Sequence, residues 1–243
     1  MLSKSPLFSL ENIPFFNHKT LSQKSIMERL RITDDGFTTL YSSEFGQFYH
    51  SVRGAMAETQ LVYIDLGLLA KAQEIKEINV LEIGFGTGLN ALVSVLEAQK
   101  HDLKLHYTTL EPFPISNDDV QLLNYQDELH TQILKNLHEA KWEEEVEINS
   151  NFYLTKIKTT LQNFSSNKLF DVVYYDAFAP SSQPELWTEE TFAKVASVMQ
   201  KGGFLTTYCS KTVVRKAMQA AGFIVEKHQG MWGKREVVRA VKG

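Results

Sequence analysis

The sequence predicts an α/β fold, a doubly wound Rossmann-like sheet of seven strands preceded by an N-terminal β-hairpin extension. Three observations carry this prediction. Short apolar runs alternate with helical periodicities along most of the chain, as they do in βαβ units. A glycine cluster follows the apolar run at residues 78–83 and opens a helical pattern, as expected for a strand, a tight turn and a helix N-terminus. Two further apolar runs end at acids, Glu111 and Asp176.

The composition is that of an ordinary globular protein, with 243 residues of which 43% are hydrophobic and 22% charged. No run of about 18 apolar residues occurs, so we expect no membrane span, and the N-terminus lacks the pattern of a signal peptide. The single cysteine, Cys209, excludes an intrachain disulfide and fits a reducing compartment, so we expect a cytoplasmic protein. Scattered histidines predict no metal site. Because the net charge is −4, a nucleic-acid partner requires basic residues gathered in one patch.

Residues 1–53 are predicted to form an arm and a hairpin extension. The hairpin is expected over residues 28–43, because β-forming residues flank the turn sequence DDG at 34–36. An aromatic-rich segment follows at residues 44–51. It either covers the core as a surface loop or contacts a ligand, and aromatic density alone does not decide between the two.

The remainder, residues 54–243, is predicted to form one domain in which strands and helices alternate. The apolar runs predict seven strands, at residues 78–83, 103–110, 146–155, 169–176, 202–209, 223–229 and 236–241. The 146–155 run also fits two short strands. Apolar spacing of three or four residues and capping signals predict helices at residues 54–69, 87–99, 117–145, 156–164 and 211–221, and one capped by Thr188.

The glycine turn contains Gly84, Gly86 and Gly88. A dinucleotide-binding turn has its third glycine three residues after the second, but here Leu89 occupies that position. A carboxylate at Glu82, just before the turn, would repel a pyrophosphate and suits a positively charged group, such as the sulfonium or amino group of S-adenosylmethionine. We therefore predict that the turn binds S-adenosylmethionine, the alternative being a glycine-rich turn without a ligand.

Two strand-end acids complete the predicted cofactor site. Glu111 ends the second strand of the sheet, where such folds hydrogen-bond a ribose, and Asp176 ends the fourth. The alternative for each is a capping or turn carboxylate. Residues near Lys156 are expected to contact the adenine edge. The predicted cofactor-binding residues are Glu82, Gly84, Gly86, Gly88, Asn90, Glu111, Lys156 and Asp176.

Five short segments, in their order along the chain, carry a family resemblance. They are GAMAETQ at 54–60, GFGTGLN at 84–90, DAFAP at 176–180, PELWT at 184–188 and GKRE at 233–236. They resemble the methyltransferase component of the tRNA 5-methylaminomethyl-2-thiouridine biosynthesis (MnmC) family, within the class I S-adenosylmethionine-dependent methyltransferases. The resemblance implies that residues 54–243 are a methyltransferase domain with a class I sheet.

Bifunctional members of this family carry a flavin-dependent oxidase after this domain, whereas this sequence stops at Gly243. It is therefore similar to the stand-alone, MnmD-type form, and we expect no flavin oxidase domain in this chain. The resemblance implies one reaction, transfer of a methyl group from S-adenosylmethionine to the amine of 5-aminomethyl-(2-thio)uridine at the wobble position of tRNA. The chain departs from the family at residues 154–157, where LTKI replaces a Gly-Asp pair, so the partner of the adenine amino group stays open.

Three residues are predicted to carry the chemistry. Asp176 is expected to accept a hydrogen bond from the substrate amine or to take its proton, since an alkylammonium has no lone pair. Lys234 and Arg235 are expected to bind tRNA phosphate or to disfavour the ammonium by like charge, the alternative being exposed ends of a surface hairpin. Predicted substrate contacts are Tyr49, Glu58, Phe178, Pro180, Trp187 and Lys234.

Three rival functions are compatible with parts of the sequence. An aminopropyltransferase resembling spermidine synthase shares the fold and an amine nucleophile, but the Lys-Arg-Glu ending at 234–236 favours the tRNA enzyme. An adenine-N6 methyltransferase requires an Asn/Asp-Pro-Pro-aromatic sequence where residues 176–179 read DAFA. An RNA-binding scaffold without turnover does not explain the intact glycine turn and strand-end acids.

Overall fold

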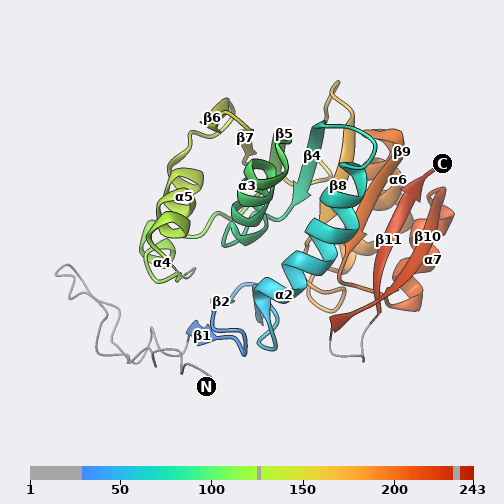
Figure 1. Cartoon of the computed structure of the whole chain (residues 1–243). Helices are drawn as coiled ribbons and strands as arrows, with labels where there is room; N and C mark the ends of the chain where they lie inside the picture. Colours follow the sequence, from blue (N-terminus) through green and yellow to red (C-terminus); the bar gives the residue numbers. More distant parts are fainter. Residues whose placement is uncertain (1–28, 125–126, 232–235) are drawn as a thin grey trace, which may run out of the picture.

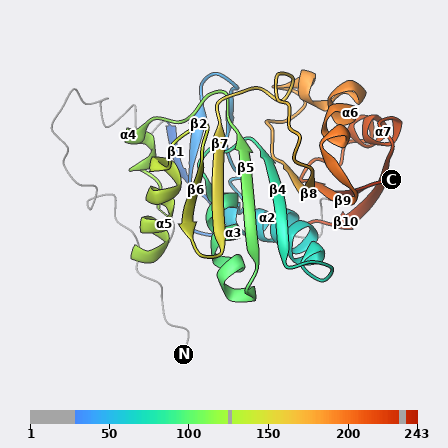
Figure 2. The ribbon, with the colours of Figure 1, turned by 90° about the horizontal axis from the view of Figure 1, so that it is seen from above.

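The computed structural model describes residues 29–124, 127–231 and 236–243 (Figure 1). A large sheet forms its centre. Its strands are β4 (Glu77–Ile83), β5 (Lys104–Leu110), β6 (Glu145–Asn149), β7 (Phe152–Ile157), β8 (Phe170–Tyr175), β9 (Met199–Thr207), β10 (Phe223–Gln229) and β11 (Glu236–Lys242). Their order across the sheet is β10-β11-β9-β8-β4-β5-β7-β6, and Figure 2 shows this succession from above. The five strands from β9 to β7 are parallel, and the strands beyond them at either end are antiparallel.

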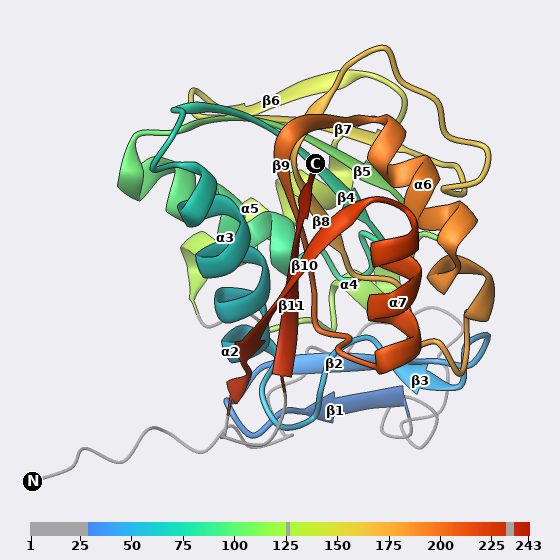
Figure 3. The same ribbon diagram turned by 90° about the vertical axis from the view of Figure 1, so that its right-hand side faces the viewer.

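Helices cover both faces of this sheet, as predicted. They are α2 (Ala55–Thr59), which continues as a π-helix (Gln60–Leu69), α3 (Leu89–His101), α4 (Asn117–Val120), α5 (Glu128–Glu139), a 3-10 turn (Pro184–Trp187), α6 (Glu189–Ser197) and α7 (Thr212–Ala220). Figure 3 shows α3 and α5 on one side of the sheet, and α6 and α7 on the other. Within the described part of the chain, no helix is long and apolar enough to cross a membrane.

The central strands are buried on both faces, which explains their continuous apolar runs. In β4, Ile78 and Val80 belong to the core under α3, whereas Leu81 and Ile83 belong to the core under α6 and α7. This alternation follows the two-residue period of a strand. The parallel strands β4, β5 and β8 consequently end at one edge of the sheet, where the glycine turn and the two strand-end acids come together.

The structure differs from the sequence prediction in three segments. The sheet has eight strands instead of seven, because residues 145–157 fold into the antiparallel pair β6 and β7, which is the two-strand alternative predicted for this segment. The predicted helix at 156–164 is wrong, since β7 continues to Ile157 and a loop follows; its β-branched residues favour extended backbone. The predicted helix at 117–145 is instead α4 and α5, and Asp127 caps α5 through the backbone N–H of His130.

The N-terminal extension is a small sheet of three antiparallel strands. They are β1 (Leu30–Ile32), β2 (Thr38–Ser42) and β3 (Gln47–Phe48). The first two form the predicted hairpin, with Gly36 at a positive φ of 88° in the turn. The third strand was not predicted and comes from the aromatic-rich segment. Figure 3 shows this sheet at one end of the large sheet.

Asp35 joins the small sheet to the rest of the molecule. Its carboxylate accepts hydrogen bonds from the backbone N–H groups of Ala55, Met56 and Ala57, at 2.9–3.2 Å. These are among the amides that a helix leaves without intrahelical partners at its N-terminus. The negative charge also interacts favourably with the helix dipole. The hairpin turn therefore fixes the start of the helix that later supplies residues to the functional site.

We predict that Asp35→Ala lowers the free energy of unfolding by about 1–2 kcal/mol, the usual contribution of a helix cap. Urea denaturation followed by circular dichroism measures this difference. Asp34→Ala is the matched control, because Asp34 lies in the same turn with an exposed side chain, and its hydrogen bond to the carbonyl of Val52 is donated by the backbone N–H. Equal stability of the two variants would contradict the capping role.

Candidate functional site

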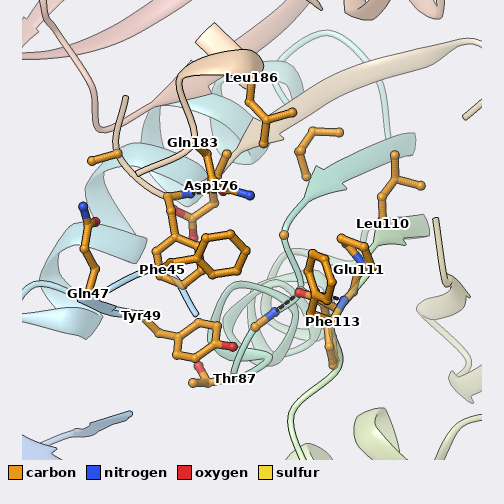
Figure 4. A pocket seen from close by; sticks show the side chains of 18 of the residues that line it. Phe45, Gln47, Tyr49, Thr87, Leu110, Glu111, Phe113, Asp176, Gln183 and Leu186 are labelled. Atoms are coloured by element: carbon orange, nitrogen blue, oxygen red, sulfur yellow. Dashed lines mark hydrogen bonds between the residues drawn. The ribbon is translucent and has the colours of Figure 1, made fainter. Parts of the chain in front are cut away.

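A cavity of about 1000 Å³ lies at the carboxyl ends of β4, β5 and β8 (Figure 4). Its walls come from the glycine turn, the segments after β5 and β8, the start of the first helix and the small N-terminal sheet. This is the edge at which open α/β sheets bind ligands. The predicted site residues that line the cavity are Tyr49, Glu58, Gly84, Gly86, Asn90, Glu111, Asp176 and Phe178.

The glycine turn is closely packed on two sides. Gly84 has φ of 94°, and a Cβ atom there would lie 2.9 Å from the carbonyl oxygen of Asp176. Gly86 has φ of 51°, and a Cβ atom there would lie 2.8 Å from the ring of Tyr49. Both positions therefore exclude a side chain by backbone conformation and by space. The turn can consequently bring its backbone close to a ligand in the cavity.

Glu111 holds the glycine turn against the end of β5. One carboxylate oxygen accepts the backbone N–H of Gly86 at 2.9 Å, drawn as a dashed line in Figure 4. The other accepts the N–H of Phe113 at 2.8 Å. Burial raises the pKa of Glu111 above its usual range, and these amide donors oppose that shift. The carboxylate keeps capacity to accept from a further hydroxyl donor such as a ribose.

Asp176 is fixed by two donors, one on each carboxylate oxygen. The hydroxyl of Tyr63 donates to Oδ1 at 2.6 Å, and the side-chain amide of Asn90 donates to Oδ2 at 2.8 Å. Burial raises the pKa of Asp176 to about 6, although both hydrogen bonds favour the charged form. Asp176 is thus ionised at neutral pH and accepts a proton more readily than an ordinary aspartate.

Two residues of the first helix hold Asp176 in place, Tyr63 directly and Thr59 through Asn90. Thr59 donates to the amide oxygen of Asn90 at 2.9 Å, which turns the Asn90 NH2 group toward Asp176. Thr59 and Tyr63 are four residues apart, so they lie on the same side of the helix. Tyr63 was not among the predicted site residues, although it lies three residues beyond the GAMAETQ segment. A helix continued from that segment would have placed Tyr63 on the same side as Thr59, which was the available signal for it.

The segment after Asp176 is held by its own side chains. Trp187 donates its indole N–H to the carbonyl of Phe178 at 2.9 Å, and Gln183 accepts the N–H of Phe178 at the same distance. Trp187 is buried and does not line the cavity, and neither does Pro180. These two predicted substrate contacts therefore lie outside the cavity lining, Trp187 in the core and Pro180 partly exposed. Trp187 orients the wall segment that carries Phe178.

Three predicted cofactor residues also lie outside the cavity lining. Glu82 is fully buried and does not line the cavity, and burial raises its pKa well above the usual range. Gly88 caps α3 in a left-handed conformation. Lys156 donates to the carbonyl of His138 at 2.6 Å and lies 4.7 Å from the ring of Trp142; burial lowers its pKa to about 8. Lys234 and Arg235 lie outside the described residues.

The lining also contains residues that sequence reasoning missed. Phe45 reaches the cavity from the turn between β2 and β3, and Phe113 from the segment after β5. Residues 159–162, predicted to be helical, instead contribute a loop to the wall beyond β7. His50 reaches the glycine turn, where its ring lies 2.7 Å from the hydroxyl of Thr87.

The charge of the lining is one-sided. Its described residues include five carboxylates and neither lysine nor arginine; the acids are Glu44, Glu58, Glu111, Asp176 and Glu185. Burial lowers the pKa of His50 to about 4, so its ring is neutral at pH 7. Such a cavity attracts positively charged ligands and opposes the entry of phosphate. Within the described ranges, no group of three His, Cys, Asp or Glu residues is arranged to hold a metal ion.

The parallel sheet, the glycine turn and the strand-end acids define a Rossmann-like class of proteins that bind an adenosine-containing cofactor at this edge. Residues 121–243 match the family described as S-adenosyl-L-methionine-dependent methyltransferases. Because this match covers half of the chain, the protein belongs to that family. The lining fits the cofactor, since a carboxylate-rich cavity suits its sulfonium and amino groups and Glu111 keeps capacity to accept from its ribose.

Sequence relatives and one solved structure are similar to this chain, and all of them are MnmC proteins. The chain is 32% identical to the tRNA 5-methylaminomethyl-2-thiouridine biosynthesis bifunctional protein MnmC of Methylobacillus flagellatus, over 82% of this chain and 33% of the relative. It is 31% identical to the MnmC protein of Delftia acidovorans, over 84% and 33%. The chain thus spans about a third of these relatives. The crystal structure of MNMC2 from Aquifex aeolicus superimposes with a TM-score of 0.72 at 27% identity, covering 88% of this chain and 70% of that one.

Proposed function

We propose that the protein transfers a methyl group from S-adenosylmethionine to the amine of 5-aminomethyl-(2-thio)uridine at the wobble position of tRNA. The observation that carries this proposal is the carboxylate of Asp176, held by Tyr63 and Asn90 in a cavity lined by acids. A primary amine is cationic at neutral pH, so this lining favours its entry. The names of the MnmC relatives supply the tRNA and the modified uridine.

The cofactor would be held by elements that the sequence already suggested. The backbone of the turn at Gly84 and Gly86 lines the cavity, and Glu111 is the candidate partner of the ribose hydroxyls. The loop at residues 159–162 is the candidate for the adenine edge, in place of Lys156, which is buried. When bound, S-adenosylmethionine supplies an electrophilic methyl group on a positively charged sulfur.

Asp176 would prepare the substrate amine for attack. The carboxylate takes a proton from the ammonium, and the neutral nitrogen then has a lone pair for the methyl carbon. Transfer of the methyl group from the cofactor sulfur to this nitrogen would then leave a secondary ammonium and S-adenosylhomocysteine, with the sulfur retaining the electron pair of the broken carbon–sulfur bond. The proton taken by Asp176 would pass to solvent. Tyr63 and Asn90 keep the two carboxylate oxygens in fixed positions, and this orientation is a large part of such catalysis.

We also propose that residues 54–243 are the catalytic domain and that residues 1–53 belong to an accessory extension. Tyr49, from the extension, packs on Gly86 of the cofactor turn, so the extension would close the cavity on that side. tRNA is the proposed partner. Lys234 and Arg235, next to β11, stay candidates for phosphate contacts.

The direct test is transfer of a labelled methyl group from S-adenosylmethionine to tRNA carrying 5-aminomethyluridine. Nucleoside digestion and mass spectrometry then locate the label. We expect it on the aminomethyl nitrogen, and we expect Asp176→Asn to lower kcat by about 10²–10⁴-fold, the usual contribution of general base catalysis. Glu226→Gln, on the distant strand β10, is the matched control. Label on a base carbon or on a ribose, or full turnover by Asp176→Asn, would contradict the proposal.

A second prediction concerns the pH dependence of that reaction. The value of kcat/KM, which reports ionisations of the free enzyme, rises with pH as Asp176 ionises, with a midpoint near its pKa of about 6. The hydrogen bond from Tyr63 stabilises the carboxylate and lowers this pKa. Tyr63→Phe removes the bond, raises the pKa and moves the acidic limb of kcat/KM to higher pH, so the variant loses more activity at pH 6 than at pH 8.

The matched control is Tyr153→Phe, the same change on β7 outside the cavity lining. Values of kcat/KM are measured at subsaturating tRNA and cofactor from pH 5 to pH 9. An unshifted acidic limb in Tyr63→Phe would show that the hydrogen bond does not tune the ionising group.

A further inference from the structure

Four aromatic rings meet in the cavity wall next to Asp176. Phe45 stacks on Phe178, with ring centroids 4.5 Å apart and planes inclined by 23°. The ring of Phe113 contacts Phe45 edge-on at 5.8 Å, and Tyr49 lies 5.2 Å from Phe178. All four line the cavity. In Figure 4, Phe45 lies near the centre of the view, between Asp176 and Tyr49.

The stacked pair joins two segments that are far apart in the sequence. Phe45 belongs to the turn between β2 and β3, and Phe178 follows Asp176 by two residues. The backbone of the turn is closed by a hydrogen bond from Gly46 N–H to the carbonyl of Ser42 at 2.9 Å. The ring of Phe45 contacts Phe113 and Phe178 across the cavity. Gln47, two residues further on, donates to the hydroxyl of Ser182 at 2.6 Å, so an outward movement of the turn would break this hydrogen bond as well.

From this arrangement we propose that Phe45 and Phe178 form an aromatic clamp for the target base, which parts to take the pyrimidine ring between its two rings. The proposal rests on the function proposed above and names the residues that recognise its substrate. Two stacked rings in contact leave no room for a third, so the turn carrying Phe45 moves outward when the base enters. Phe178 stays in place, because Trp187 and Gln183 hold its backbone.

The chemistry of the cavity explains why only the base would enter. Its described lining has five carboxylates and no lysine or arginine, so a phosphate in the cavity would be repelled. A stacked base is uncharged and brings its cationic aminomethyl arm toward Asp176. Enzymes that act on a base in a folded nucleic acid commonly extrude it from its stack and hold it between aromatic or apolar side chains.

Two substitutions separate stacking from simple packing. Phe45→Leu keeps an apolar side chain but removes the aromatic face, whereas Phe45→Tyr keeps that face. Stacking of a base on an aromatic ring is lost on truncation at a cost equivalent to about tenfold in affinity or more. We expect Phe45→Leu to raise KM for an anticodon stem-loop carrying 5-aminomethyluridine by about tenfold, and Phe45→Tyr to stay within about twofold of wild type. Ile32→Ser, an exposed position on β1, is the control for the small sheet.

Calorimetry of S-adenosylhomocysteine binding distinguishes an effect of Phe45 on base recognition from an effect on cofactor binding. We expect Phe45→Leu to leave the dissociation constant within about twofold. A parallel weakening of cofactor and stem-loop would overturn the clamp and place Phe45 in the cofactor site through Phe113. An unchanged KM in Phe45→Leu would equally overturn it. Failure of the wild-type chain to methylate any tRNA would instead refute the function on which the clamp rests.

A binding signal independent of turnover completes the test. In Phe45→Trp, the emission of the new indole is compared with that of wild type while a stem-loop is added together with S-adenosylhomocysteine. We expect quenching by the stem-loop with 5-aminomethyluridine and little quenching by the same stem-loop with an abasic target position. Equal quenching by both would show contact with the RNA backbone in place of the base, and would contradict the clamp.

Discussion

The site depends on the two hydrogen bonds that hold Asp176. They join the end of β8 to α3 through Asn90 and to the π-helical segment through Tyr63. Asn90 is in turn oriented by Thr59, and the helix that carries Thr59 starts at amides capped by Asp35. Asp35 in the N-terminal hairpin thereby helps to fix the hydrogen bonds around Asp176 at the end of β8. Small changes in the hairpin are therefore expected to reach the site through the first helix.

Burial and charge give the cavity its selectivity. Desolvation raises the pKa of both Glu111 and Asp176, yet amide and hydroxyl donors keep these carboxylates in fixed orientations. The same desolvation keeps His50 neutral. The described lining thus carries five carboxylates and neither lysine nor arginine, and a cationic ligand in the cavity would meet a favourable potential. A sulfonium cofactor and an ammonium substrate both meet this condition, although they also repel each other until the ammonium loses its proton.

The sequence predicted the parts of the site that depend on local pattern. The glycine turn, Glu111 and Asp176 could be identified because each lies directly at the end of an apolar strand. Phe45 and Tyr63 were missed, since Tyr63 meets Asp176 across 113 positions of sequence and Phe45 reaches Phe178 from a different sheet.

Burial and backbone propensity explain the remaining differences. Glu82 was expected to face a ligand, but it lies within β4 with its side chain in the core between Tyr107 and Asn90. Strand alternation argues against a ligand contact by Glu82. Because Ile83 lines the cavity, the side chain of Glu82 points to the opposite face of the sheet. The predicted helix at 156–164 does not form, because the β-branched residues Ile157, Thr159 and Thr160 disfavour helical backbone.

The central claim is that the cavity recognises an amine through its carboxylates, and one binding comparison tests it most directly. Two anticodon stem-loops, one with 5-aminomethyluridine and one with 5-hydroxymethyluridine, are titrated into the protein with S-adenosylhomocysteine at pH 7. The two groups have nearly the same shape but differ in charge. Hydrogen bonds to charged groups contribute about 1.5–3 kcal/mol, so the account predicts at least about tenfold tighter binding of the amine. Equal affinities would contradict it, because the acids would then play no part in choosing the substrate.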